Sequence, residues 1–92
     1  MGVNRRRSHF EIIAEMIKIG ENGAGKTQIM YSANMSYGQI QKYLGFLLSH
    51  GFIEKLKMGN PSVTYHMTDS GEKLLKSINT VMEMLGDVDD EL

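Results

Sequence analysis

The sequence predicts an α+β fold that is mostly α, with a three-helix core, a β-hairpin and a C-terminal helix. Two observations carry this prediction. Residues 26–75 read as a helix, a short turn, a second helix, a tight hairpin and a further helix. An amphipathic helical pattern precedes them. This order of elements defines a winged helix-turn-helix, in which one helix and one β-loop lie on the same side of a small core.

Length and composition limit the chain to one globular unit. Its 92 residues, 41% hydrophobic and 23% charged, suffice for one core and leave no room for a second. We assign residues 1–85 to this domain, including a dimerisation helix over about 68–85, and residues 86–92 to an acidic flexible tail. The chain has no cysteine, no apolar run of membrane-spanning length and no signal-peptide pattern. We therefore expect a cytoplasmic protein.

The first two helices follow from apolar spacing and glycine. Phe10, Ile13, Ala14 and Ile17 recur at helical intervals and predict an amphipathic helix over residues 5–19. The glycine-rich run 20–25 ends it. A short second helix is expected over 26–33, with Ile29 and Met30 as its core contacts and Thr27 as its cap.

The third helix and the hairpin carry clearer local signals. Ser36 and Gln39 form a capping box, and Gly51 supplies a left-handed stop after His50. The apolar face of this helix is Ile40, Leu44, Leu47 and Leu48. Residues 52–57 and 63–67 are strand-like, and the turn chemistry of 59–62 joins them into a hairpin.

The last helix is expected to begin after Thr68 and to reach about Leu85. Leu74, Ile78, Val81 and Leu85 repeat at intervals of 4, 3 and 4, which is the spacing of a coiled-coil seam. Packing of the whole seam on the chain's own core is the alternative. We favour a homodimer contact through the part of the helix that extends past the compact body, namely Ile78, Val81, Met82 and Leu85.

Charge is divided unequally along the chain. Residues 1–60 hold eight basic and four acidic side chains, a net charge of +4, whereas residues 61–92 hold two basic and seven acidic ones, a net charge of −5. The overall charge of −1 conceals this polarity. It is compatible with a basic binding face and an acidic far end.

The third helix and the hairpin therefore form a candidate surface for duplex DNA. Small and polar residues opposite the apolar face permit close approach to a groove, glutamine can pair with a base edge and lysine can neutralise phosphate. A solvated face without a partner is the alternative for each residue. The predicted groove residues are Ser36, Tyr37, Gln39, Gln41 and Lys42; the wing residues are Lys55, Lys57 and Asn60; and the phosphate contacts are Arg5, Arg6, Arg7 and Lys26.

Other chemistry finds little support. Residues 20–27 match the phosphate-binding pattern G-x-x-x-x-G-K-[ST], but such a loop works between a strand and a helix, and helical spacing precedes it here. A glycine-rich turn between helices explains the same letters. His9, His50 and His66 lack metal-ligand spacing, and no catalytic arrangement can be argued. We predict no enzyme, no cofactor and no metal.

Four blocks of sequence (26–31, 35–44, 51–53 and 65–75) together resemble the archaeal winged helix-turn-helix transcriptional regulators. This group includes small dimeric chromatin-associated proteins. The resemblance implies an archaeal DNA-binding homodimer with the third helix in the major groove and the hairpin as wing. In that group the last helix often continues into a long antiparallel coiled coil, whereas the seam here ends near Leu85.

We therefore predict specific or semi-specific binding of duplex DNA by a homodimeric transcriptional regulator. Two alternatives remain. One is a winged helix that binds a protein partner, which an exposed Phe46 would favour. The other, more distant, is nucleotide binding at residues 20–27.

Overall fold

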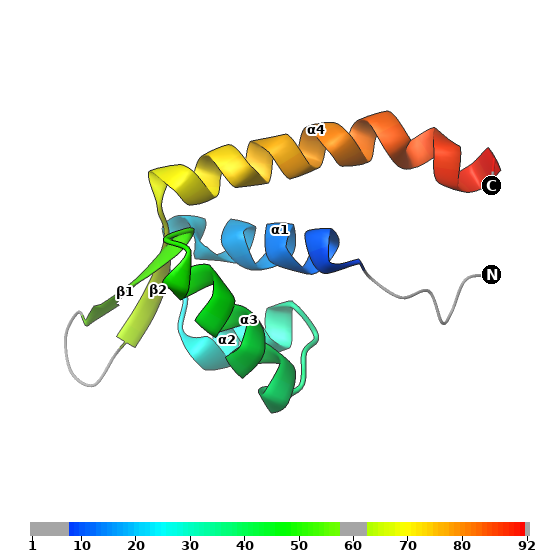
Figure 1. The fold of residues 1–92 in the computed structure, drawn as a ribbon. Helices are drawn as coiled ribbons and strands as arrows, with labels where there is room; N and C mark the ends of the chain where they lie inside the picture. Colours follow the sequence, from blue (N-terminus) through cyan, green and yellow to red (C-terminus); the bar gives the residue numbers. More distant parts are fainter. Residues whose placement is uncertain (1–7, 58–62, 92) are drawn as a thin grey trace.

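The computed structural model describes residues 8–57 and 63–91, which form helices and one antiparallel hairpin (Figure 1). The elements in order are α1 (His9–Ile19), the 3-10 turn η1 (Gly20–Asn22), α2 (Lys26–Ser32), α3 (Tyr37–Ser49), β1 (Ile53–Lys57), β2 (Val63–Met67) and α4 (Asp69–Glu91). Figure 1 shows α1 between α4 on one side and the α2–α3 pair on the other, with the hairpin at one end. The predicted winged helix-turn-helix is confirmed.

Helix α1 begins at His9, not at Arg5 as predicted. Ser8 is its N-cap: the Ser8 hydroxyl accepts from the Glu11 amide, and the Glu11 carboxylate accepts from the Ser8 amide, each at 3.1 Å. This capping box fixes the start of the helix. Because α1 is covered on two sides, its buried residues are Ile12, Ala14, Met16 and Ile17. Phe10, whose spacing contributed to the predicted apolar face, is exposed.

Helices α2 and α3 form the helix-turn-helix. Gly25 is the N-cap of α2 and makes no side-chain cap, so the predicted cap at Thr27 is wrong. The capping box of α3 is confirmed, since the Ser36 hydroxyl accepts from the Gln39 amide and the Gln39 side chain accepts from the Ser36 amide. Asn34 in the turn between the helices has a φ of 55°, and Gly51 after α3 has a φ of 75°.

The hairpin is extended by one further row of hydrogen bonds. Ile53 pairs with Met67 and Lys57 with Val63 in the antiparallel register. Ala24, in the turn between α1 and α2, forms an isolated bridge with Tyr65 on the other edge of β2. The turn of the hairpin lies outside the described residues.

Helix α4 runs antiparallel to α1 and past its first turn (Figure 1). The Thr68 hydroxyl accepts from the Gly71 amide at 3.0 Å and donates to the Gly51 carbonyl at 2.6 Å, which confirms Thr68 as the cap. Ile78, expected at a dimer contact, is 5% exposed and belongs to the core. The helix extends to Glu91, past the end expected near Leu85.

The core joins all of these elements. Its largest fully buried side chains are Met16, Ile17, Ile29, Ile40 and Leu47, and the hairpin adds Ile53 and Tyr65. Burial of large apolar side chains from each element is what holds α3 at its angle to the rest of the domain. Over residues 8–57 and 63–91, no helix has the length and apolar character needed to cross a membrane.

Candidate nucleic-acid interface

The outer face of α3 is a stripe of small side chains around one lysine. Helical geometry places Gly38, Lys42, Gly45 and Ser49 opposite the buried Ile40, Leu44 and Leu47, and all four are exposed. The exposed Gln41 flanks this stripe. The face can therefore approach another surface closely, with one cation near its centre.

The two glycines of the stripe have no role inside the domain. A Cβ placed on Gly38 or on Gly45 would meet no atom within 4 Å, and both residues have helical backbone. Glycine in a helix interior costs about 1 kcal/mol of stability relative to alanine. Gly45 therefore weakens α3 without an internal packing reason, which is understandable if the space above it receives a partner.

The start of α3 is held by its own side chains. Ser36 and Gln39 make the capping box, so one oxygen of each side chain is already used for the helix. Tyr37, the first residue of α3, is 63% exposed, and the Lys26 ammonium lies 5.0 Å from the centre of its ring. The structure thus brings together two residues predicted to contact DNA, Lys26 at the start of α2 and Tyr37 at the start of α3.

The register of the hairpin places the wing lysines on β1, one strand away from the segment that leads into α2. Lys55 pairs with Tyr65, and Tyr65 pairs in turn with Ala24, so these three residues form one row across the sheet. Two rows further along, Lys57 pairs with Val63, whose carbonyl oxygen would lie 3.9 Å from a Cβ on Gly25. Lys55 and Lys57 are both exposed. Both lie on β1, and β2 separates them from the residues 23–25 that lead into α2 at Lys26.

Positive and negative side chains of the described residues lie on different sides of the domain. From residue 22 to residue 53 the sequence contains no aspartate or glutamate, and this stretch spans α2, the turn and α3. The acidic side chains Glu11, Glu15, Glu21, Asp69, Glu72 and Glu83 belong to α1, η1 and α4. The helix-turn-helix therefore carries positive charge only, and the α1–α4 side carries most of the negative charge.

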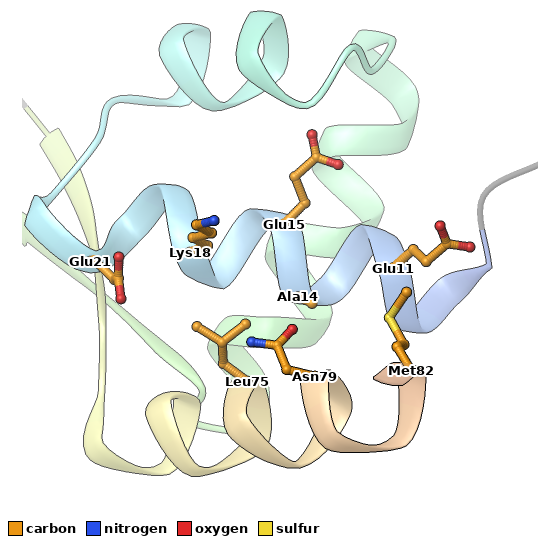
Figure 2. Close-up of a pocket in the computed structure, with 8 residues that line it drawn as sticks. All are labelled: Glu11, Ala14, Glu15, Lys18, Glu21, Leu75, Asn79 and Met82. Atoms are coloured by element: carbon orange, nitrogen blue, oxygen red, sulfur yellow. The ribbon is translucent and has the colours of Figure 1, made fainter. Parts of the chain in front are cut away.

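A groove of about 380 Å³ lies between α1 and α4 (Figure 2). Leu75, Asn79 and Met82 line it from α4, and charged side chains of the α1–η1 segment form its other wall. Figure 2 shows that these charged groups do not converge, since the Glu15 carboxylate points away from α4 and Glu21 lies at the far end. No three His, Asp or Glu side chains gather as a metal ion would require anywhere in the described part of the chain.

An aromatic cluster borders the C-terminal end of α3. The ring centroids of Phe46 and His50 are 4.3 Å apart, and those of Phe46 and Phe52 are 6.4 Å apart. Phe46 remains 42% exposed. On the α1 side, Tyr43 is half-buried and its hydroxyl lies 2.6 Å from His9 Nδ1. The pairing of His9 with Tyr43 could not be predicted from sequence, because 34 positions separate the two residues.

The remaining predicted contacts are not placed by the structure. Asn60 and the three arginines at positions 5–7 lie outside the described residues. For the residues 20–27, the structure shows α1 and η1 where a phosphate-binding loop needs a strand. The glycines of this segment instead border β2, which explains their presence without a nucleotide.

A family model of the winged helix-turn-helix matches residues 6–86. The chain belongs to this family. It is a family of binding domains, not of enzymes, as the sequence predicted.

Two proteins of the archaeon Methanocaldococcus jannaschii are related in sequence. The uncharacterized protein MJ0287 is 40% identical over 89% of this chain and 82% of its own length. The uncharacterized protein MJ0290 is 35% identical over 87% of this chain, which spans only 36% of that longer protein. The predicted resemblance to archaeal winged-helix proteins is confirmed.

Solved winged-helix structures share the fold at lower sequence identity. Sso10a-2, a DNA-binding protein from Sulfolobus solfataricus, superposes with a TM-score of 0.81 at 23% identity, covering 92% of this chain and 88% of its own. Lactococcus lactis ZitR, solved in complex with DNA, superposes with a TM-score of 0.63 at 17% identity, covering 99% of this chain and 65% of its own. At these identities the similarity shows the fold alone.

Proposed function

We propose that this winged-helix protein binds duplex DNA through α3 and the hairpin, acts as a homodimer and regulates transcription. The observation that carries the proposal is the charge of the helix-turn-helix. Between Glu21 and Glu54 the only charged side chains are Lys26 and Lys42, apart from histidine, and the exposed Lys55 and Lys57 follow on the wing. The helix-turn-helix, with cations and no anions, suits a phosphate backbone, and the wing adds two cations to the single carboxylate of Glu54.

In this proposal the predicted residues have different tasks. The stripe of small side chains lets α3 approach the major groove of DNA. There Lys42 contacts a phosphate and Gln41 contacts the edge of a base. Ser36 and Gln39 hold the start of α3, and Lys26 with Tyr37 contacts the backbone beside it. Lys55 and Lys57, with Asn60, contact phosphate from the wing, and the arginines at 5–7 add further phosphate contacts.

The outer face of α3 has few side chains that distinguish bases. The stripe itself contains two glycines, one serine and Lys42, and the Gln39 oxygen is engaged in the cap. Base discrimination depends on hydrogen bonds from side chains to base edges. We therefore propose semi-specific binding in which phosphate contacts supply most of the affinity.

The distal part of α4 supplies the dimer contact in this proposal. Val81 and Leu85 are 49% and 51% exposed and lie one helical turn apart, with Met82 beside them. Large apolar side chains grouped on one exposed helix face are typical of an interaction surface. Ile78 is excluded because it belongs to the core.

Similar proteins are consistent with this proposal. Sso10a-2 is a DNA-binding protein and ZitR has been solved bound to DNA, and both share the arrangement of helices and wing. Binding to chromosomal DNA would also agree with the cytoplasmic location expected from the sequence.

Fluorescence anisotropy with a labelled mixed-sequence duplex, repeated across a salt series, tests the proposal. The logarithm of the association constant should fall linearly with the logarithm of salt concentration, by about 0.9 per phosphate contacted. Lys42→Ala should weaken binding and reduce this slope by about one contact without lowering the melting temperature. Lys73→Ala, on the exposed face of α4, is the matched control. Absence of binding at low salt would contradict the proposal.

One observation favours a second candidate function, a winged helix that binds a protein. Phe46, His50 and Phe52 form a partly exposed aromatic cluster next to α3. Aromatic side chains are enriched at the centres of protein interfaces. Salt-insensitive binding to a co-purifying protein, lost in Phe46→Ala and retained in Lys42→Ala, would favour this function over DNA binding.

A further inference from the structure

Strand β2 packs closely against the turn between α1 and α2. The Ala24 amide donates to the Tyr65 carbonyl at 3.0 Å, and the Tyr65 amide donates to the Ala24 carbonyl at 2.8 Å. A Cβ on Gly20 would lie 3.4 Å from the Met67 amide nitrogen. Glycine at this position therefore permits the close approach of the strand, and the wing is docked on the segment that leads into α2.

His66 fills the space above a second glycine of this turn. The antiparallel pairing of Ala24 with Tyr65 places Gly23 opposite His66 in the next row. Gly23 has a φ of 83°, and a Cβ there would collide with the imidazole ring, so the ring lies directly over the Gly23 backbone. His66 Nε2 also lies 2.8 Å from Thr64 Oγ1, which holds the ring on the same face of β2. Glu54 faces His66 from β1.

We infer that His66 is a positioning residue that sets the angle of the wing against α2 and α3, a role that rests on the DNA binding proposed above. Beyond the Ala24–Tyr65 row, the described sheet consists of β1 and β2 only, and a two-stranded hairpin is marginally stable by itself. The ring on Gly23 is a side-chain contact between this hairpin and the turn that leads into α2. Lys55 lies in the Tyr65 row and Lys57 beyond it, so a change in the angle of the hairpin displaces both lysines.

Salt-dependent DNA binding of His66 variants tests this role. His66→Ala should weaken binding about fivefold and make the salt dependence shallower by about one to two phosphate contacts, because the wing lysines are no longer held in place. His66→Phe keeps a ring over Gly23 and should retain most of the affinity and the slope. A slope in His66→Ala equal to that of the wild type would overturn the inference.

A double-variant comparison separates positioning from a general loss of stability. If His66 acts through the wing, His66→Ala should change neither affinity nor slope further in a Lys55→Ala, Lys57→Ala background. Below the unfolding temperature, a residue that only stabilises the domain would lower the melting temperature and leave the affinity unchanged in both backgrounds, and that result would also overturn the inference. Circular dichroism melting of each variant establishes that the assay temperature lies below unfolding.

Hydrogen exchange measured by NMR distinguishes failure of this inference from failure of the proposed DNA binding. In the free protein, the β1 and β2 amides should exchange faster in His66→Ala than in the wild type, while the α3 amides should be unchanged. If the wild type does not bind DNA, the proposed function fails and the exchange data alone decide whether His66 holds the wing. Unchanged exchange in the hairpin would show that it does not.

Discussion

The ammonium group of Lys26 lies 5.0 Å from the centre of the Tyr37 ring, which joins the first residue of α2 to the first residue of α3. A cation over an aromatic face at an exposed site is worth about 0.5–1 kcal/mol. The pair therefore orients both groups modestly at the edge of the helix-turn-helix. Each residue was predicted as a DNA contact, but their mutual contact is visible only in the tertiary structure.

Tyr37→Ala should weaken DNA binding about two- to fivefold, because Lys26 loses the ring that holds its ammonium group in place. Tyr37→Phe keeps a ring and should bind nearly as well as the wild type. Anisotropy titrations at one salt concentration measure both. Wild-type affinity in Tyr37→Ala would remove the pair from the binding surface.

Gly45→Ala should raise the free energy of unfolding by about 1 kcal/mol and yet weaken DNA binding about tenfold. Alanine is the better helix former, and the space around Gly45 is open in the free protein, so the cost arises only when α3 approaches a groove. Urea unfolding and anisotropy measure the two effects. An unchanged affinity would show that α3 does not approach DNA closely at this point.

Gly71→Ala is the matched control in a helix whose glycine has an internal role. A Cβ on Gly71 would collide with the Phe52 carbonyl oxygen, so this variant should lose about 2 kcal/mol of stability or more. Opposite signs of the stability change at Gly45 and Gly71 are expected. Equal signs would contradict the packing described for either site.

Ser36 variants separate the capping of α3 from its contact with DNA. Ser36→Ala should cost about 1 kcal/mol of stability because the Gln39 amide loses its acceptor. Ser36→Asp keeps an acceptor and should retain stability, but its negative charge at the proposed DNA surface should weaken binding markedly. Ser8→Asp makes the same change at the start of α1 and is the control. Equal losses of affinity in the two aspartate variants would contradict the assigned surface.

Leu85→Glu should convert the proposed dimer into a monomer, because a charge would replace an exposed apolar side chain at the contact. Thr80→Glu, also exposed and on another face of α4, should leave the dimer intact. Sedimentation equilibrium measures the mass of each. A wild-type protein that remains monomeric at high concentration would refute the dimer, and DNA binding would then have to be explained by single domains.

The elements with strong local signals were predictable from sequence. The capping box at Ser36, the left-handed stop at Gly51 and the cap at Thr68 follow from the sequence, because each depends on residues a few positions apart. The start of α1 was missed although Ser8 and Glu11 carry the same capping-box spacing. Apolar periodicity misled at Phe10, since spacing cannot tell which sides of a helix are covered.

By itself, the sequence determined the order of the elements, the division of charge and the family, because periodicity, caps and turn residues act over short distances. The tertiary structure alone decided that Ile78 belongs to the core while Val81 and Leu85 remain exposed. It alone showed that Lys26 meets Tyr37 and that His66 covers Gly23. These relations join residues on different elements, and only the packing of the elements sets which residues meet.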